Sequence, residues 1–196
     1  KTEINDRDGK SVVRYLVMTH SFIPTREKLA EHIRVDHVPY DAWERMGLLT
    51  VTDTPIVDQS SVMRYVIDTC SANKWIIQSL DFDPANASKL MMDLSEEGYI
   101  VEEVFQSHKS LNESTQGFRE QVICGNITAP PNPLLNYSMS NAVIRRYNGL
   151  IKIDKDAARK RIDPVDAILC AYKLAMYHVF TPSRDENIDK FLQMDF

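Results

Sequence analysis

Residues 75–105, WIIQSLDFDPANASKLMMDLSEEGYIVEEVF, contain one full cycle of strand, helix and strand. The apolar run at 75–82 has the length of a strand, and the proline after Asp83 fits the first turn of a helix. Gly98 is typical of the position after a helix, and residues 99–105 are again strand-like. This cycle predicts an α/β or α+β protein rather than an all-helical or all-β one.

The same alternation of strands and helices extends to both sides of this stretch. Residues 12–23 are rich in β-branched and aromatic types and predict one long strand. An Asn-Gly pair at 148–149 separates two apolar runs and predicts a hairpin, and a long helix then starts at Asp163. Further helices are expected at about residues 25–34, 39–46, 58–69, 110–125 and 134–140, and a short strand at 48–52.

Together these elements predict one domain over residues 1–180, in which helices flank both faces of a mixed β-sheet, and a polar tail at residues 181–196. The chain has 196 residues, 43% of them hydrophobic, which is enough for one compact core. Its apolar runs are far shorter than the ~20 residues of a membrane span, and its first residues do not form a signal peptide. We therefore expect a soluble, intracellular protein. Its cysteines and tryptophans are expected to be buried, at Cys70, Cys124, Cys170, Trp43 and Trp75.

The sequence lacks the motifs of several common enzyme classes. It contains no GxxxxGKS/T phosphate loop, no GxGxxG, no GxSxG and no HExxH. Among the histidines only His32 and His37 stand close together, and two exposed polar residues are a better interpretation of that pair than a zinc site. ATP hydrolysis at a phosphate loop and zinc-protease chemistry are therefore not predicted for these residues.

Basic residues gather in one segment of an otherwise acidic chain. The formal net charge is −5, from 23 Lys and Arg against 28 Asp and Glu. A basic strip on an acidic body is typical of a surface that contacts a nucleic-acid backbone, while a solvated run of charges is the alternative interpretation. The residues of this basic segment are Arg145, Arg146, Lys152, Lys155, Arg159, Lys160 and Arg161.

Two aspartates stand at equivalent junctions of the predicted elements. Asp83 follows an expected strand, Asp163 follows the basic segment, and each precedes a proline at an expected helix start. Taken alone, each is typical of a helix N-cap, and Asp166 is typical of a carboxylate that complements the helix dipole. The functional alternative is that these carboxylates converge at one edge of the sheet, where oxygen ligands bind hard divalent cations. Two such cations can promote phosphodiester hydrolysis.

Several short motifs occur in the order of a known family. They are LDFDPANA at 80–87, NPLL at 132–135, SNAV at 140–143 and RIDPVDA at 161–167, preceded upstream by FIP at 22–24 and VPYDAW at 38–43. In this order and spacing, over roughly residues 15–178, the chain resembles the nuclease domain of the large terminase subunits of tailed phages.

The resemblance implies a ribonuclease H-like fold and an endonuclease that uses Mg²⁺ or Mn²⁺ to cut concatemeric viral DNA during packaging. The aspartate of the family's Tyr/Phe-Asp-Pro motif falls on Asp83, and that of its Arg-Ile-Asp motif falls on Asp163. Both are therefore predicted to be metal ligands and catalytic residues, with Asp166 as a further ligand one turn along. The implied partners are double-stranded DNA, a portal protein and a small terminase subunit, in the cytoplasm of the host.

Two features of the family's pattern do not occur in the sequence. An aspartate that the family carries in its first strand has no counterpart before Val12, and there is no ATPase domain with its phosphate loop. We therefore expect the first strand of the nuclease domain to be truncated in these residues. The alternative functions are a module that docks on the portal or the small subunit without cleaving DNA, and a related junction resolvase.

Overall fold

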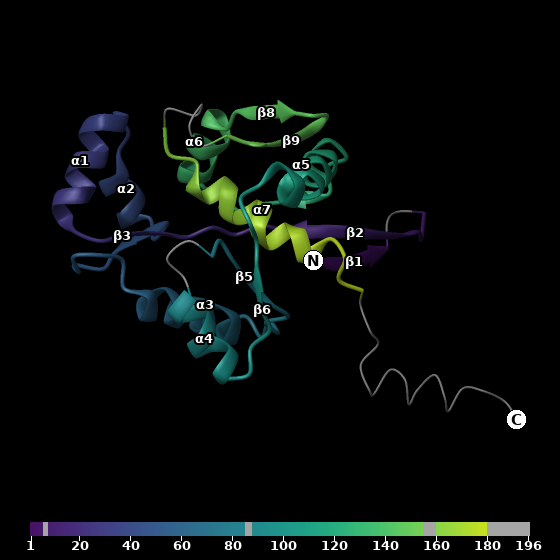
Figure 1. Cartoon of the computed structure of the whole chain (residues 1–196), viewed down its shortest axis with the longest axis horizontal. Coiled ribbons are helices and arrows are strands. Elements are labelled where there is room, and N and C mark those ends of the chain that lie inside the picture. The colour runs from purple at the N-terminus through teal and green to yellow at the C-terminus, as the bar shows by residue number, and fades with distance from the viewer. Residues whose placement is uncertain (6–7, 85–87, 155–159, 180–196) are drawn as a thin grey trace, which may run out of the picture.

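The structure is a computed structural model that describes residues 1–5, 8–84, 88–154 and 160–179 (Figure 1). Within these residues the helices are α1 (Arg26–Asp36), α2 (Tyr40–Arg45), α3 (Gln59–Ala72), α4 (Ser88–Glu96), α5 (His108–Ile123), α6 (Pro133–Asn141) and α7 (Asp163–Ala175). The strands are β1 (Thr2–Asn5), β2 (Ser11–Leu16), β3 (Ser21–Ile23), β4 (Leu49–Val51), β5 (Leu80–Phe82), β6 (Val101–Glu103), β7 (Ile127–Thr128), β8 (Ile144–Tyr147) and β9 (Leu150–Ile153). The tail predicted at 181–196 lies outside the described residues.

The described strands form several small sheets. β2 lies between β1, which is antiparallel to it, and β7, which is parallel to it. β3–β4 and β5–β6 are parallel pairs, and β8–β9 is the antiparallel hairpin predicted from the Asn-Gly pair at 148–149. The mixed α/β architecture expected from the sequence is confirmed, with its strands divided among these sheets instead of paired in a continuous one.

The long strand predicted at residues 12–23 is interrupted because its pairing partner changes. In the middle of this segment the amide of Val17 donates to the carbonyl of Thr128, which belongs to β7. Four residues later the amide of Ser21 donates to the carbonyl of Leu48, next to β4. One extended segment therefore serves two sheets, and Figure 1 shows it passing from β2 across to β3.

Among the described residues the core consists of two larger clusters of buried apolar side chains and a small third one around Val104. The first packs α7 against α5 and β2, and the second packs α1, α2 and α6 against β3 and β4. Helix α6 joins the two clusters, because Leu135 belongs to the first and Leu134 to the second. The first cluster includes Tyr15, Phe118, Leu135, Ile162, Val165, Leu169 and Tyr172, and the second includes Ile23, Leu29, Tyr40, Trp43, Leu49 and Leu134.

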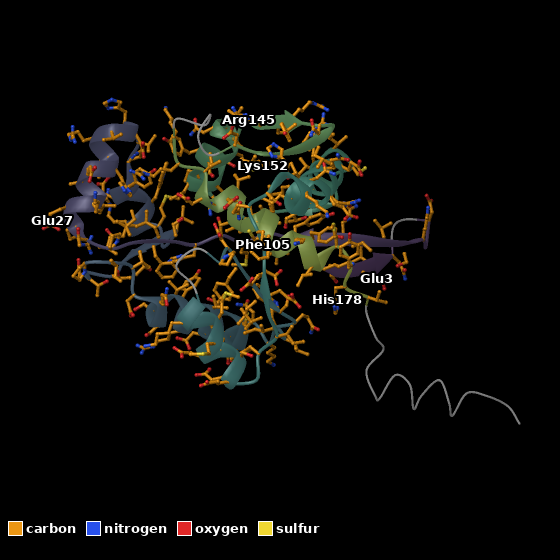
Figure 2. All side chains as sticks on the ribbon, viewed as in Figure 1. Glu3, Glu27, Phe105, Arg145, Lys152 and His178 are labelled. Atoms are coloured by element: carbon orange, nitrogen blue, oxygen red, sulfur yellow. The ribbon has the colours of Figure 1, made fainter. Side chains whose placement is uncertain are left out.

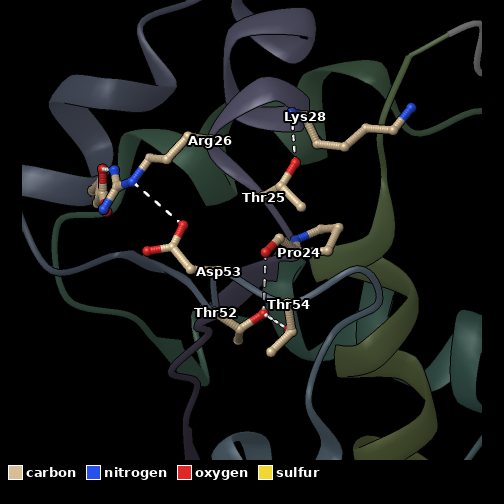
Figure 3. A network of polar contacts seen from close by, with 8 residues as sticks. Pro24, Thr25, Arg26, Lys28, Thr52, Asp53 and Thr54 are labelled. Carbon is tan, nitrogen blue, oxygen red and sulfur yellow. Dashed lines mark hydrogen bonds and ion pairs between the residues drawn. The ribbon is translucent and has the colours of Figure 1, made fainter.

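Polar contacts fix the direction in which α1 leaves β3 (Figure 3). Thr25 caps the helix by accepting a hydrogen bond from the amide of Lys28 at 3.2 Å. Arg26, in the first turn, lies 3.8 Å from Asp53, which follows β4. α1 ends at His37, whose φ of +56° turns the chain toward α2. Local sequence and neighbouring strands therefore act together to place the α1–α2 unit, which we define as residues 26–45.

One helix start differs from the sequence predictions. α5 begins at His108, ahead of the start predicted at Ser110, because Ser107 caps it by accepting a hydrogen bond from the amide of Ser110 at 3.1 Å. Ser107 and Ser110 both have the chemistry of a cap, and the structure uses Ser107. The helix start predicted directly after Asp83 falls on residues 85–87, which lie outside the described residues.

The burial predictions are confirmed in part. Trp43 and Cys170 are buried. Trp75 is 42% exposed, because only residues 80–82 of the apolar run at 75–82 form a strand. Cys124 is also exposed, since it follows α5 at its C-cap, and Cys70 is half-buried. The predictions of a buried Trp75 and a buried Cys124 are therefore wrong.

Candidate active site

Helix α7 begins with an acidic residue that does not cap the helix. Ile162 occupies the cap position, is 2% exposed and makes no side-chain hydrogen bond to the helix. Asp163 is the first helical residue and is exposed. The interpretation of Asp163 as an N-cap is therefore wrong, and its carboxylate stands in solvent at the positive end of the helix dipole.

One face of α7 lines a groove. Asp163, Ala167, Ala171 and Ala175 recur at every fourth residue, and all four lie along a cavity of about 590 Å³. The opposite wall is the extended segment at residues 15–23 that runs from β2 to β3. Because alanine side chains are short, this face of α7 leaves the groove open along the length of the helix as far as Asp163.

The groove lining carries polar side chains from α1, from α6 and from the segment before α7. His32, Tyr137, Ser138 and Arg161 all line it. Ser138 is 1% exposed, and its Oγ has no hydrogen-bond partner among the described residues, nor does Nδ1 of His32. Buried polar atoms in proteins are normally satisfied by protein, by a bound molecule or by ordered water. The groove therefore offers unsatisfied hydrogen-bonding atoms beside an apolar wall.

Asp83 stands directly after β5, and its side chain is half-buried. Residues 85–87, where the predicted helix start and an Asp83 cap would fall, lie outside the described residues. Asp166, in the first turn of α7, is 7% exposed. Of the three predicted ligands, Asp163 is thus exposed, Asp83 half-buried and Asp166 buried.

Strand β5 runs antiparallel to α7. Asp81, in the middle of β5, lies within electrostatic reach of Lys173 in the last turn of α7. Val104, whose amide donates to the carbonyl of the next β5 residue, packs against Cys170, which lies one turn earlier in α7. The chain direction of β5 therefore points toward the first turn of α7, and this brings Asp83 from its carboxyl end toward the other two predicted ligands.

Asp81 is an acidic residue that the sequence interpretation set aside. Burial, with a smaller contribution from the charge of Glu102, raises the pKa of its carboxyl to about 6, although a hydrogen bond from Ser79 and the charge of Lys173 oppose the shift. Its Oδ1 is buried without a hydrogen-bond partner among the described residues. The sequence interpretation left Asp81 out because it placed this residue on the opposite face of the strand, although residues two apart on a continuing strand lie on the same face.

Carboxylate oxygens are the ligands that hard divalent cations prefer, so the chemistry of the three aspartates fits Mg²⁺ or Mn²⁺. Within the described ranges, however, no three His, Cys, Asp or Glu side chains are grouped closely enough to hold a metal ion. The described residues thus provide suitable donor atoms without a complete set of ligands.

The basic segment is divided between two places in the structure. Arg145 and Lys152 are cross-strand partners in the β8–β9 hairpin, and Figure 2 shows their side chains at this hairpin. Arg145 lies 3.0 Å from Asp154, and Nζ of Lys152 donates to the carbonyl of Gln106 at 3.0 Å. Arg146, on the same hairpin, is exposed. Intramolecular contacts therefore engage part of the charge that the sequence had assigned to DNA.

The other described basic residues precede α7. Nζ of Lys160 lies 5.7 Å from the ring centroid of Tyr137. Arg161 donates from Nε to Oδ2 of Asp36 at 3.0 Å. Lys155 and Arg159 lie outside the described residues. Sequence interpretation did not identify Asp36, because an aspartate at the end of a helix carries no signal for a partner so distant in the chain.

A family profile described as "Terminase large subunit, endonuclease domain" matches residues 7–178 of this chain. The match includes Asp83, the groove and the whole of α7. The chain belongs to the terminase large subunit endonuclease family. This confirms the family resemblance that the sequence motifs indicated.

Two relatives of this terminase endonuclease domain show how much of a longer protein it corresponds to. Protein YmfN of Escherichia coli (strain K12) is 24% identical over 157 residues, which cover 78% of this chain and 34% of YmfN. The terminase large subunit of Enterobacteria phage HK97 is 28% identical over 156 residues, which cover 75% of this chain and 29% of that subunit. The chain thus spans about a third of the length of these relatives.

A solved structure supports the fold of the terminase endonuclease domain. The crystal structure of the HK97 bacteriophage large terminase superposes with a TM-score of 0.69 at 23% identity, covering 88% of this chain and 35% of that one. At this identity the likeness establishes the fold, which is ribonuclease H-like as predicted. None of the helices described is long and apolar enough to cross a membrane.

Proposed function

We propose that this chain is the metal-dependent DNA endonuclease domain of a phage packaging terminase, which cuts concatemeric viral DNA by two-metal phosphodiester hydrolysis. The observation that carries the proposal is the exposed, non-capping carboxylate of Asp163 at the end of the groove, with β5 directing Asp83 toward the same end of α7. Asp163 does not have the helix-capping role that would explain its place in the sequence by structure alone.

In this proposal Asp83, Asp163 and Asp166 hold Mg²⁺ or Mn²⁺. The bound cations supply charge that activates a water molecule and stabilises the leaving oxygen of the phosphodiester. The exposed carboxylate of Asp163 faces the substrate, while the buried Asp166 supports the same site from within the first turn of α7. The protein's own contribution is to hold these carboxylates together at the end of a groove.

The three aspartates form no complete ligand group by themselves among the described residues. With fewer carboxylates a pair of divalent cations is left under-neutralised, which weakens metal binding. The proposal assigns residues 1–180 to the nuclease domain and residues 181–196 to a polar tail.

The proposed substrate is double-stranded DNA, held through its phosphates by the exposed members of the basic segment. Contacts of Lys and Arg with phosphates carry no sequence information by themselves, so little base specificity is expected. A portal protein and a small terminase subunit are the proposed packaging partners, in the cytoplasm of a phage-infected host.

A plasmid-nicking assay with Mn²⁺ tests the proposal, on this chain and on one extended at its N-terminus along its own gene. We expect nicking by the extended chain, lost in Asp83→Asn and in Asp163→Asn. Asp41→Asn, which changes an exposed aspartate of α2, is the matched control and retains activity. Nicking that survives in the double variant of Asp83 and Asp163 would overturn the assignment.

A non-cleaving module that docks on the portal or the small subunit is the second candidate. The observation in its favour is again the incomplete set of metal ligands in the described residues. An extended chain that binds DNA yet nicks none at any Mn²⁺ concentration would support this second function and contradict the first.

A further inference from the structure

An ion pair with a buried carboxylate connects the α1–α2 unit to the start of α7. Arg161 and Asp36 are 125 residues apart in the chain, and Nε of Arg161 donates to Oδ2 of Asp36 at 3.0 Å. The Asp36 side chain is 5% exposed, and that of Arg161 is 38% exposed. The hydroxyl of Tyr40 donates to the same carboxylate oxygen at 2.8 Å. Asp36 is thus held from its own helix unit and from the segment that leads into α7.

Asp36 needs both of these partners because its carboxylate is buried. A buried carboxylate is costly unless it is paired with a cation and hydrogen-bonded, and Asp36 has both kinds of partner. Burial and the hydrogen bond to Asp36 raise the pKa of Tyr40, so its phenol stays protonated and continues to donate. Loss of Arg161 would leave the buried charge without its cation.

The residues on both sides of Arg161 are also anchored. Lys160 lies over the ring of Tyr137, which itself contacts Trp43 of α2 with ring centroids 5.8 Å apart. On the other side, Ile162 is 2% exposed and belongs to the first core cluster. Three consecutive residues therefore attach the chain to a ring, to a carboxylate and to the core, directly before the exposed Asp163.

The first turn of α7 depends on this attachment because it lacks a side-chain cap. The amides of Val165 and Asp166 both donate to the carbonyl of Ile162, at 2.9 and 3.1 Å. The position of Ile162 therefore decides where the first turn lies. In most helices a polar side chain at the cap position stabilises this turn locally, whereas here a contact with a distant helix takes its place.

We propose that Asp36 is a positioning residue of the active site: through its ion pair with Arg161 it holds the first turn of α7 in place and so fixes the location of Asp163. This inference rests on the proposed function, in which Asp163 is a metal ligand. It assigns Arg161 to the support of the site rather than to a DNA phosphate, and it gives the α1–α2 unit a role in catalysis without any contact to substrate.

Hydrogen exchange of single amides in the 196-residue chain tests whether the ion pair between Asp36 and Arg161 holds the first turn of α7 in place. In Asp36→Asn we expect the amides of Val165 and Asp166 to exchange roughly tenfold faster relative to the amide of Phe118 in α5, since a charge-assisted hydrogen bond is lost. Arg161→Lys keeps the charge but loses the planar guanidinium, and its effect is smaller. Exchange that accelerates equally at all three amides, or at none, would overturn the proposal.

Asp41→Asn is the matched control for these variants. It removes a carboxylate of the neighbouring α2 that pairs with Arg45 at 3.0 Å on the surface, so it leaves the ratio of the exchange rates unchanged. A change in that ratio in the control would show that any lost carboxylate in the unit loosens α7, which contradicts a specific role for Asp36.

The Mn²⁺ dependence of plasmid nicking by the extended chain tests the link to the site. In Asp36→Asn the Mn²⁺ concentration for half-maximal nicking rises about tenfold, while the rate at saturating Mn²⁺ falls less, because the ligands are displaced but still present. If nicking is normal in the starting protein and its Mn²⁺ dependence does not change in Asp36→Asn, the positioning role is wrong. A different outcome is that the starting protein nicks no DNA while the exchange of the Val165 and Asp166 amides, relative to that of Phe118, changes as expected. In that case the proposed function is wrong, and the support of α7 by Asp36 is confirmed.

Discussion

The guanidinium of Arg145 lies 3.0 Å from the carboxylate of Asp154, although 62% of the Arg145 side chain and only 5% of the Asp154 side chain is exposed. The exposed Arg145 side chain is thus paired with a buried acidic residue that directly follows β9. Sequence counts treat every basic residue as equally available to DNA, whereas the structure separates those with an intramolecular partner from those without. This difference has a measurable consequence for DNA binding.

Arg146 and Arg161 are expected to differ in their contribution to DNA binding. Arg146 is exposed and makes no ion pair within the described part of the chain, while Arg161 is paired with Asp36. Arg146→Gln should reduce the slope of log K against log salt by about 0.9, the value for one lost phosphate contact, and Arg161→Gln by clearly less. Fluorescence anisotropy with a DNA duplex at several salt concentrations measures both slopes. Equal reductions would place Arg161 at a phosphate and argue against its positioning role.

The sequence predicts those parts of the fold that local chemistry determines. The helix at Asp163 and the hairpin around Asn148 and Gly149 have strong local signals, and the structure confirms both. The division of the strand at 12–23 was not predictable, because it depends on which neighbours pair with its two ends. Residues 155–159, which include two members of the basic segment, lie outside what the structure describes.

The site was predictable only as a set of residue types. Motif spacing pointed to Asp83 and Asp163, but taken alone each was more typical of a helix cap, and only for Asp163 does the described helix start exclude that role. Nothing in the sequence pairs Asp36 with Arg161, because a contact over 125 residues leaves no periodic signal. The groove depends on the same kind of long-range packing, since its walls come from β2, β3 and α7.

Asp58 and Asp163 should show opposite patterns of stability and activity. Asp58 caps α3 by accepting hydrogen bonds from the amides of Ser60 and Ser61, so Asp58→Ala should cost about 1 kcal/mol in the free energy of unfolding and leave DNA nicking intact. Asp163 accepts no capping bond, so Asp163→Asn should cost less than about 1 kcal/mol, from the helix dipole alone, while abolishing nicking. Urea unfolding and the nicking assay on the extended chain measure the two effects. A loss of stability in Asp163→Asn as large as in Asp58→Ala would restore its capping interpretation.

His20 should make the fold less stable in mild acid. Its ring stacks on Tyr65 with centroids 3.9 Å apart, and its Nε2 lies 2.8 Å from the hydroxyl of Thr50. Burial lowers the pKa of His20, while a hydrogen bond with the backbone of Gly47 partly opposes the shift. The unfolded chain, with a His pKa of about 6.5, therefore takes up the proton more readily than the folded one. The free energy of unfolding should fall as the pH drops below about 6.5 and level off below the folded pKa.

The measurement for His20 is the difference in unfolding free energy between pH 7.5 and pH 5.5, obtained from urea titrations. His20→Gln cannot be protonated in this range, so its stability should fall by less between the two pH values than that of the starting protein. The comparison at pH 7.5 alone gives the cost of losing the ring stack and serves as the reference. An equal loss in both proteins would show that other groups control the pH dependence.

Any side chain in place of Gly117 should disturb the packing of α5 against α7. A Cβ at Gly117 would lie 3.3 Å from both Cε1 and the hydroxyl oxygen of Tyr172, which is closer than ordinary van der Waals contact. The Tyr172 ring cannot yield easily, because Phe118 and Tyr15 contact it with centroid distances of 5.5 and 5.1 Å. Gly117→Val should therefore destabilise the fold by about 1–3 kcal/mol through overpacking, although glycine is a poor helix former.

The decisive comparison is Gly117→Ala made alone and together with Tyr172→Phe. Removal of the hydroxyl relieves one of the two close contacts, so the alanine should be tolerated better beside phenylalanine than beside tyrosine. If urea unfolding gives the same effect for alanine in both backgrounds, the two helices adjust their spacing freely and the hydroxyl contact does not set it.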